Sequence, residues 1–156
     1  MAERYSTTPL HQNLGVKESS ILALLHAPAN LVLDLPTSVD VRRRARGRAD
    51  VILSFYTRVA ELERQIEVLG TMIFPSGGLW IAWPKKSSGE STDLTDHEVR
   101  DVALPLGLVD NKVCAIDETW TAMRLVWRLD RRTTFEGSSR GIARRPAPPT
   151  GEPLTS

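Results

Sequence analysis

Short apolar runs, broken by prolines, glycines and charged residues, alternate along the middle of the chain with one clearly amphipathic segment. Three continuous runs have the length and the content of β-branched or aromatic residues typical of strands buried on both faces. They lie at residues 20–27, 50–56 and 79–83. Residues 38–42 alternate apolar and polar positions, which predicts a strand nearer the edge of a sheet.

Helices are predicted between these runs. One amphipathic helix has apolar positions spaced by four, three and four residues: Leu62, Ile66, Leu69 and Ile73. Residues 95–98, with the sequence Thr-Asp-His-Glu, form a capping box that predicts the start of another helix. Residues 28–35 lie just before a second proline and are expected to form a brief helix. Residues 112–116 and 121–127 predict two strands of an antiparallel hairpin.

This order of strands and helices predicts the fold class. Helical crossovers impose parallel strands and right-handed connections. We therefore expect an α/β fold, a three-layer Rossmann-like (methyltransferase-like) sandwich whose mostly parallel sheet ends in a C-terminal antiparallel hairpin. The expected folded domain is residues 13–130, preceded by a partly ordered N-terminal segment (1–12). Residues 131–156, rich in Arg, Pro and Ser, are expected to form a disordered tail.

Composition narrows the class of protein further. The chain has 156 residues, of which 41% are apolar and 25% charged, the balance of a soluble globular domain. No apolar stretch approaches the roughly 20 residues that a membrane helix needs, so we expect a cytoplasmic protein without a membrane partner. The single cysteine, Cys114, excludes an internal disulfide and is expected to be a small core residue. The three histidines have no metal-ligand spacing, so no metal is expected.

Charge is distributed unevenly. From Arg131 onward there are five arginines and two glutamates, a net of +3, which leaves 15 cations against 17 anions in residues 1–130. The nearly neutral body argues against a nucleic-acid interface spread over the whole domain, although it does not exclude nucleic acid. Residues 42–48 contain five arginines without an interleaved aromatic residue. We interpret them as a solvated strand end and loop, with polyanion binding as the alternative.

Two resemblances extend this picture. Ala49-Asp50-Val51-Ile52, the amphipathic helix, the segment FPSGGLWI (residues 74–81) and the closing hairpin together resemble the second half of a class I S-adenosylmethionine-dependent methyltransferase. The segments LGVKESSILALLHAP, RADVILSFYT, GGLWIAWPKKSSGESTDLT and VALPLGLVDNKVCAIDETWTAMRLVWR are similar to a bacterial family designated domain of unknown function 3052. That likeness covers about residues 13–130 and implies no activity.

The sequence departs from the methyltransferase pattern where such enzymes bind their cofactor. The resemblance implies a glycine-rich turn after the first strand, because glycine lets backbone amides approach the cofactor closely. Residues 26–30 read His-Ala-Pro-Ala-Asn instead, and a proline has no amide to donate. The second strand is followed by arginines and not by an acidic residue suited to ribose hydroxyls. No cofactor is therefore expected.

Candidate site residues collect at the carboxyl ends of the predicted strands, where open parallel sheets bind ligands. Three cations there are predicted anion contacts: Arg58, Lys85 and Lys86. Five further residues are predicted to form the rim: His26, Asn30, Asp117, Glu118 and Trp120. The alternative interpretation is that polar residues gather at strand ends because loops are solvated.

Three hypotheses of function follow. The first is a non-catalytic Rossmann-like domain that binds a small anionic ligand or a protein partner. The second is a divergent methyltransferase-like enzyme in which Asp117 or Glu118 acts as a base. The third is a protein that binds polyanions through the arginine run at residues 42–48. No Ser-His-Asp arrangement or other recognisable catalytic set favours the second over the first.

Overall fold

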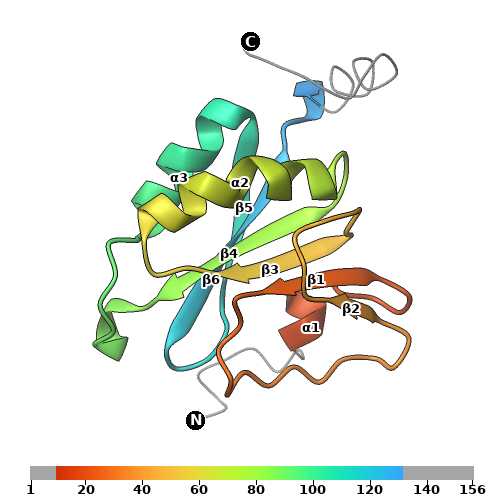
Figure 1. The fold of residues 1–156 in the computed structure, drawn as a ribbon, viewed down its shortest axis with the longest axis horizontal. Coiled ribbons are helices and arrows are strands. Elements are labelled where there is room, and N and C mark those ends of the chain that lie inside the picture. The colour runs from red at the N-terminus through yellow and green to blue at the C-terminus, as the bar shows by residue number, and fades with distance from the viewer. Residues whose placement is uncertain (1–9, 132–156) are drawn as a thin grey trace.

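Six strands form one mixed sheet in the computed structural model, which describes residues 10–131 (Figure 1). The strands are β1 (Ile21–Leu25), β2 (Asp40–Arg42), β3 (Val51–Phe55), β4 (Gly78–Pro84), β5 (Leu108–Ala115) and β6 (Trp120–Trp127). Their order is β2-β1-β3-β4-β6-β5. Strands β2, β1, β3 and β4 are parallel, and β6 is antiparallel to both of its neighbours. The predicted methyltransferase-like Rossmann fold, with its C-terminal antiparallel hairpin, is confirmed.

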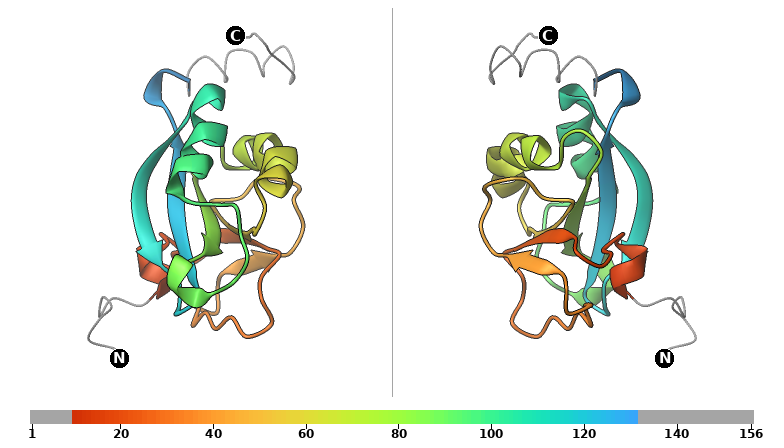
Figure 2. Two further views of the ribbon diagram at one scale, coloured as in Figure 1. Left: turned by 90° about the vertical axis from the view of Figure 1, so that its left-hand side faces the viewer. Right: turned by 90° about the vertical axis from the view of Figure 1, so that its right-hand side faces the viewer.

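Helices cover one face of this sheet. Helices α2 (Val59–Ile73) and α3 (Asp96–Ala103) lie on that face, and the short α1 (Leu10–Asn13) lies on the other (Figure 2). Two single turns, η2 (Lys86–Ser88) and η3 (Leu104–Leu106), flank α3. The predicted apolar stripe of α2 is buried against the sheet, as the spacing of its residues requires. No helix of residues 10–131 is long and apolar enough to cross a membrane.

The opposite face is covered mainly by extended chain, and the brief helix predicted for residues 28–35 is wrong. Residues Leu31, Leu33 and Leu35 are half-buried against this face, whereas the residues between them are exposed. This alternation with a period of two is the pattern of extended backbone, so each leucine reaches the core without a helix. The crossover from β1 to β2 therefore contains no helix.

Strand β4 is the central strand that its sequence predicts. All seven of its residues are buried. The indole Nε1 of Trp80 donates to the carbonyl of Leu14, 2.9 Å away. This hydrogen bond holds the chain that follows α1 against the sheet. A Cβ at Gly77 would lie 2.8 Å from the carbonyl oxygen of Asp50, so only glycine permits this approach of the turn to β3.

The hairpin begins earlier than predicted. Strand β5 starts at Leu108, directly after Gly107, whose φ of 99° reverses the chain. The ladder shifts register between Asp110 and Lys112, and this bulge interrupts the apolar alternation from which the strand was predicted. Residues 1–9 and 132–156, which include most of the predicted N-terminal segment and tail, lie outside the described residues.

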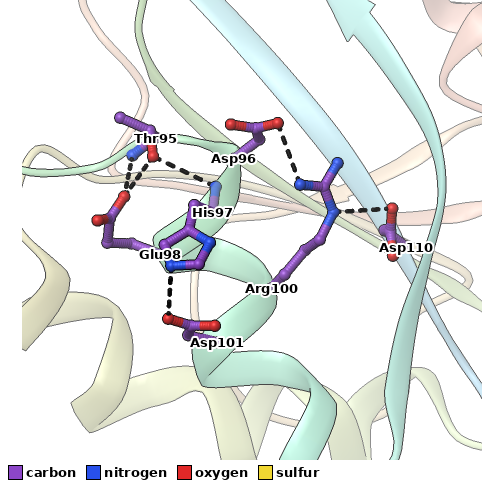
Figure 3. A network of polar contacts seen from close by, with 7 residues as sticks. All are labelled: Thr95, Asp96, His97, Glu98, Arg100, Asp101 and Asp110. Carbon is purple, nitrogen blue, oxygen red and sulfur yellow. Dashed lines mark hydrogen bonds and ion pairs between the residues drawn. The ribbon is translucent and has the colours of Figure 1, made fainter.

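Helix α3 begins with the predicted capping box (Figure 3). The amide of Thr95 donates to Glu98 Oε1 at 3.1 Å, and the Thr95 hydroxyl accepts from the amide of His97 at 3.2 Å. Arg100 then joins the helix to the sheet, because its Nε donates to Asp110 Oδ2 on β5 at 3.1 Å. These contacts place α3 beside the end of the hairpin.

Candidate functional site

A cavity of about 400 Å³ opens where the parallel strands end, and we call it the carboxyl-edge cavity. Four of its lining residues have aromatic or imidazole rings, and the other four are polar or charged. The lining residues are His26, Phe55, Tyr56, Thr57, Glu61, Arg64, Gln65 and Trp120. Its volume lies in the lower part of the range for small-molecule sites, roughly 300–1,000 Å³.

Four elements bring these residues together. His26 directly follows β1, and Tyr56 and Thr57 directly follow β3, so parallel pairing of the two strands places their ends side by side. The charged and amide residues come from the first two turns of α2. Trp120 begins β6, which is antiparallel and pairs with Pro84, so its first residue reaches the same edge. The ring of Trp120 lies edge-on to Phe55, with 5.0 Å between the ring centroids.

Gln65 connects the two strand ends. The Tyr56 hydroxyl donates to Gln65 Oε1, and His26 Nε2 lies 3.0 Å from the same oxygen. An amide oxygen only accepts hydrogen bonds, so this contact requires a proton on His26 Nε2. His26 has a φ of 58°, which is uncommon for a residue other than glycine. The contact with Gln65 joins the imidazole to α2 at the cavity wall.

Tyr56 is held in its neutral form. Burial raises the pKa of the phenol to about 12, and the negative charge of Glu61 contributes to the same direction. Ser54, two residues earlier on the same face of β3, opposes this rise in the pKa. The Ser54 hydroxyl is enclosed and makes no hydrogen bond of ordinary geometry within residues 10–131. The phenol therefore acts as a hydrogen-bond donor and not as a base at neutral pH.

Two opposite charges of α2 line the cavity without pairing. Glu61 and Arg64 are both exposed and three residues apart. Within the described part of the chain, neither side chain has a hydrogen-bond or ion-pair partner. Their charges are consequently available to a ligand in the cavity.

The cavity includes two of the eight residues predicted from the sequence, His26 and Trp120. The other six are not lining residues: Asn30, Arg58, Lys85, Lys86, Asp117 and Glu118. Asp117 Oδ1 accepts from the amides of Thr119 and Trp120, both at 2.9 Å, and so forms the turn of the hairpin. Arg58 is exposed, and its Nη2 lies 3.4 Å from Ser91 Oγ.

Sequence reasoning missed the lining residues of α2, and it missed Phe55 and Tyr56 at the end of β3. The prediction used the residues that follow strands, whereas Glu61, Arg64 and Gln65 lie one and two turns inside a helix. The helical period does indicate that these three residues lie on one flank of the buried stripe, in the first two turns of α2. The direction in which that side faces depends on how α2 crosses the sheet, which the period does not specify.

A second cavity, of about 460 Å³, lies at the amino ends of β1, β3 and β4, and we call it the amino-edge cavity. Of its five charged side chains, Arg48, Asp50 and Arg124 are bound within the chain, whereas Lys17 and Glu18 are exposed and have no ion-pair partner among the described residues. Asp50 Oδ2 accepts from the amide of Ile21 at 2.8 Å, and Oδ1 lies 2.6 Å from Arg48 Nη1. Although burial raises the pKa of Asp50, these two contacts outweigh it and lower the pKa overall. Arg124 lies against Gly78, where a Cβ would be 2.6 Å from the arginine Nε.

The arginine run contains both paired and unpaired side chains. Arg42 pairs with Asp40 at 2.9 Å, and Arg48 pairs with Asp50 at 2.6 Å. Between them, Arg43, Arg44 and Arg46 are exposed and have no ion-pair partner among the described residues. Cys114 is half-buried, and burial raises the pKa of its thiol, which disfavours a nucleophilic thiolate.

No family model and no curated protein matches the chain, so the similarity to domain of unknown function 3052 remains an expectation. Several solved structures with low sequence identity to this chain resemble it in structure. The magnesium protoporphyrin IX methyltransferase of Synechocystis PCC 6803 with bound SAH shares 10% identity, with a TM-score of 0.47 over 61% of this chain and 53% of that one. The chain thus spans about half the length of that enzyme.

Two other structures are similar to this chain at the same level. A SAM-dependent methyltransferase from Aquifex aeolicus shares 14% identity, with a TM-score of 0.48 over 74% of this chain and 86% of that one. A pericyclic reaction enzyme shares 11% identity, with a TM-score of 0.47 over 78% of this chain and 47% of that one. At such identities, likeness concerns the fold alone and not the activity.

The residues at the carboxyl edge do not fit S-adenosylmethionine bound through a glycine-rich turn. His26 occupies the first position after β1, and its side chain contacts Gln65. Pro28 has no amide, and its carbonyl accepts from Leu31, so this turn closes on itself. Arginines and not a carboxylate follow β2.

Proposed function

We propose that the protein is a non-catalytic Rossmann-like domain that binds a small molecule in the carboxyl-edge cavity. The observation that carries this proposal is the combination, in one cavity, of ring walls with charged groups that have no partner in the described chain. In open α/β sheets the carboxyl ends of the strands are the usual place for ligands. The amino-edge cavity also has two unpaired charges, Lys17 and Glu18, but Phe74 is the one aromatic residue that lines it within residues 10–131.

The cations predicted from the sequence have an outer role in this proposal. Arg58, Lys85 and Lys86 stand at the same edge of the sheet, outside the cavity lining. We propose that they attract an anionic group of the ligand by long-range charge, which salt weakens. The pair Lys85→Ala with Lys86→Ala is then expected to weaken binding at low salt and to have little effect at high salt. Equal affinities at low salt would contradict this role.

A thermal-shift panel tests the proposed function directly. The full chain is heated with amino acids, betaines, nucleotides, phosphorylated metabolites and S-adenosylmethionine. A ligand present at 100 times its dissociation constant adds about 2.7 kcal/mol to stability. Trp120→Leu should abolish the shift, whereas Arg46→Gln, an exposed change outside the cavity, should keep it. A shift that survives Trp120→Leu unchanged would show that the ligand binds elsewhere.

A divergent methyltransferase-like enzyme is the second candidate, and the fold class is the observation that favours it. Binding of S-adenosylmethionine to the full chain, measured by calorimetry, distinguishes the two functions. The non-catalytic proposal expects S-adenosylmethionine to bind no more tightly than free methionine, because the turn after β1 lacks the backbone amides that would hold the rest of the cofactor. Tight binding that depends on His26 or Gln65 would instead support the enzyme.

Polyanion binding is the third candidate, favoured by the three unpaired arginines Arg43, Arg44 and Arg46. If it is correct, retention of the protein on heparin should fall steeply with salt, because each phosphate or sulfate contact releases counterions. Replacing the three arginines with serine should then reduce both the retention and its salt dependence. Absence of retention at low salt would reject this candidate.

A further inference from the structure

The charges in the carboxyl-edge cavity identify the chemical class of its ligand. Glu61 and Arg64 are three residues apart on α2, so they project from the same side of the helix. Both line the cavity, and neither has an ion-pair or hydrogen-bond partner within residues 10–131. A cavity with one anionic and one cationic wall has no net charge to select a simple anion.

Glu61 lines the cavity together with Tyr56. Its charge acts on the Tyr56 phenol, whose hydroxyl is occupied by Gln65. Tyr56 therefore has no proton to donate to Glu61, and the carboxylate can accept from a ligand instead. Because a monoanionic ligand would face this carboxylate as well as Arg64, its attraction to Arg64 would be offset by repulsion.

The rings that line the cavity indicate which chemical group the rest of the ligand carries. Phe55 and Trp120 meet edge to face with their centroids 5.0 Å apart, and His26 and Tyr56 meet with theirs 5.5 Å apart. These two ring pairs come from opposite sides of the sheet edge. They provide apolar surface for a hydrocarbon or aromatic group.

We infer that the carboxyl-edge cavity binds a small zwitterion, an amino acid or betaine, with its ammonium at Glu61, its carboxylate at Arg64 and its apolar part against the ring walls. This inference rests on the proposed function and narrows the small anionic ligand that the sequence suggested. Charge-assisted hydrogen bonds from a primary ammonium to Glu61 and from Arg64 to a carboxylate would satisfy both side chains.

Paired analogues test the inference. The first step is a thermal-shift screen of the full chain against the twenty amino acids and glycine betaine at pH 7. The zwitterion with the largest shift is then compared by calorimetry with its decarboxylated amine and its deaminated acid, for example L-phenylalanine with phenethylamine and 3-phenylpropanoate. The zwitterion should bind at least about tenfold more tightly than either analogue, since each lacks one charged contact.

Two exposed substitutions separate the two contacts. Arg64→Gln should weaken the zwitterion and the acid about tenfold and should not weaken the amine, whose repulsion by the guanidinium it removes. Glu61→Gln should weaken the zwitterion and the amine and should strengthen the acid, because it removes the repulsion between the two carboxylates. Glu67→Gln, an exposed change on α2 outside the cavity, and Arg46→Gln are the matched controls and should bind as the native chain does.

The outcomes distinguish the inference from the proposed function. If no zwitterion shifts the melting temperature, or if an anion binds as tightly as its zwitterion, the inference is overturned. The proposed function survives that result provided another class of compound binds in a manner that depends on Trp120. If no compound in the wider panel binds, or if binding does not depend on Trp120, the proposed function fails as well.

Discussion

The two cavities at opposite edges of the sheet differ in their ring walls and in their charges: four rings line the carboxyl-edge cavity and one lines the amino-edge cavity, where bound charges stand beside the exposed Lys17 and Glu18. At the amino edge, Asp50 accepts from Ile21 and from Arg48, and Arg124 lies in the space left by Gly78. At the carboxyl edge, Glu61 and Arg64 have no partner within the described residues. Charges that are satisfied within the chain stabilise the fold, whereas unsatisfied charges beside apolar walls are available to a ligand.

This difference separates stability from binding. Substitutions at the amino edge should lower the free energy of unfolding and leave ligand affinity unchanged in the folded protein. Substitutions of exposed groups at the carboxyl edge should do the reverse, because native proteins often place functional groups where they do not stabilise the fold. The predictions below test this contrast at each edge and end with a loop that lines neither cavity.

Gly77→Ala should have the largest effect on stability. The added Cβ would lie 2.8 Å from the Asp50 carbonyl oxygen and 2.9 Å from that of Ile73, and both are backbone atoms that cannot move alone. We expect a loss of about 3 kcal/mol in the free energy of unfolding, measured by urea denaturation. Gly78→Ala should cost less, because its nearest neighbour is the flexible guanidinium of Arg124. A larger loss for Gly78→Ala would contradict this account.

Asp50→Ala should have the next largest effect. It removes the acceptor of the Ile21 amide and the partner of Arg48, and partial exposure of the carboxylate limits the expected loss to about 1–2 kcal/mol. Asp50→Asn is the matched variant, because it keeps an acceptor for Ile21 and removes only the charge. It should lose less than the alanine variant.

The effect of Asp50 depends on pH. Its pKa is lower in the folded protein than the ordinary value of 3.8, so the carboxylate stabilises the folded state at higher pH. That contribution is present above pH 3.8 and is lost as the pH falls through the lower folded-state pKa. The stability difference between the native chain and Asp50→Asn should therefore shrink in acid. A difference that stays constant from neutral pH into acid would show that the charge has no such role.

Tyr56→Phe tests the carboxyl edge and should cost about 1 kcal/mol, the value of one buried hydrogen bond. The pKa of the phenol is raised from 10.0 to about 12 in the folded state. Stability that depends on the neutral phenol is thus present below pH 10 and is lost as the pH rises toward 12. The chain has two tyrosines, so an absorbance titration of the folded protein should show one ionisation near pH 12 that disappears in Tyr56→Phe. Two ionisations that both lie near 10 would contradict the burial argument.

Replacing Arg43, Arg44 and Arg46 together with serine should change stability least. The three side chains are exposed and unpaired in the described chain, so the free energy of unfolding should stay within about 0.5 kcal/mol of the native value. Chemical denaturation measures the change. A larger loss would mean that these arginines contribute to the fold, contrary to their assignment as a solvated loop.

The fold was more predictable than the site for a physical reason. The period of Leu62, Ile66 and Leu69 specifies which face of α2 is buried, and the apolar run of β4 specifies a strand covered on both faces. Residues 28–35 were predicted wrongly because the prolines at the two ends of the segment were interpreted as the limits of a short helix. Leu31, Leu33 and Leu35 occupy every second position, and this spacing indicates extended chain. Local pattern specifies an element when burial and period agree.

The site depends instead on how distant elements meet. His26 and Trp120 were predicted because they begin or follow strands at the carboxyl edge. Glu61, Arg64 and Gln65 were missed because their position depends on the angle at which α2 crosses β3 and β1. No spacing in the sequence encodes that angle.

The most direct test of the carboxyl-edge cavity as a binding site is the indole region of a ¹H–¹⁵N spectrum during ligand titration. The chain has four tryptophans. The indoles of Trp80 and Trp127 donate to the carbonyls of Leu14 and Gly70 inside the core. We predict that a bound ligand shifts the indole signal of Trp120 most and leaves those of Trp80 and Trp127 in place. A bound ligand that leaves the Trp120 signal unmoved and shifts the amides of Ser76 and Gly77 would place binding at the amino edge and contradict the account.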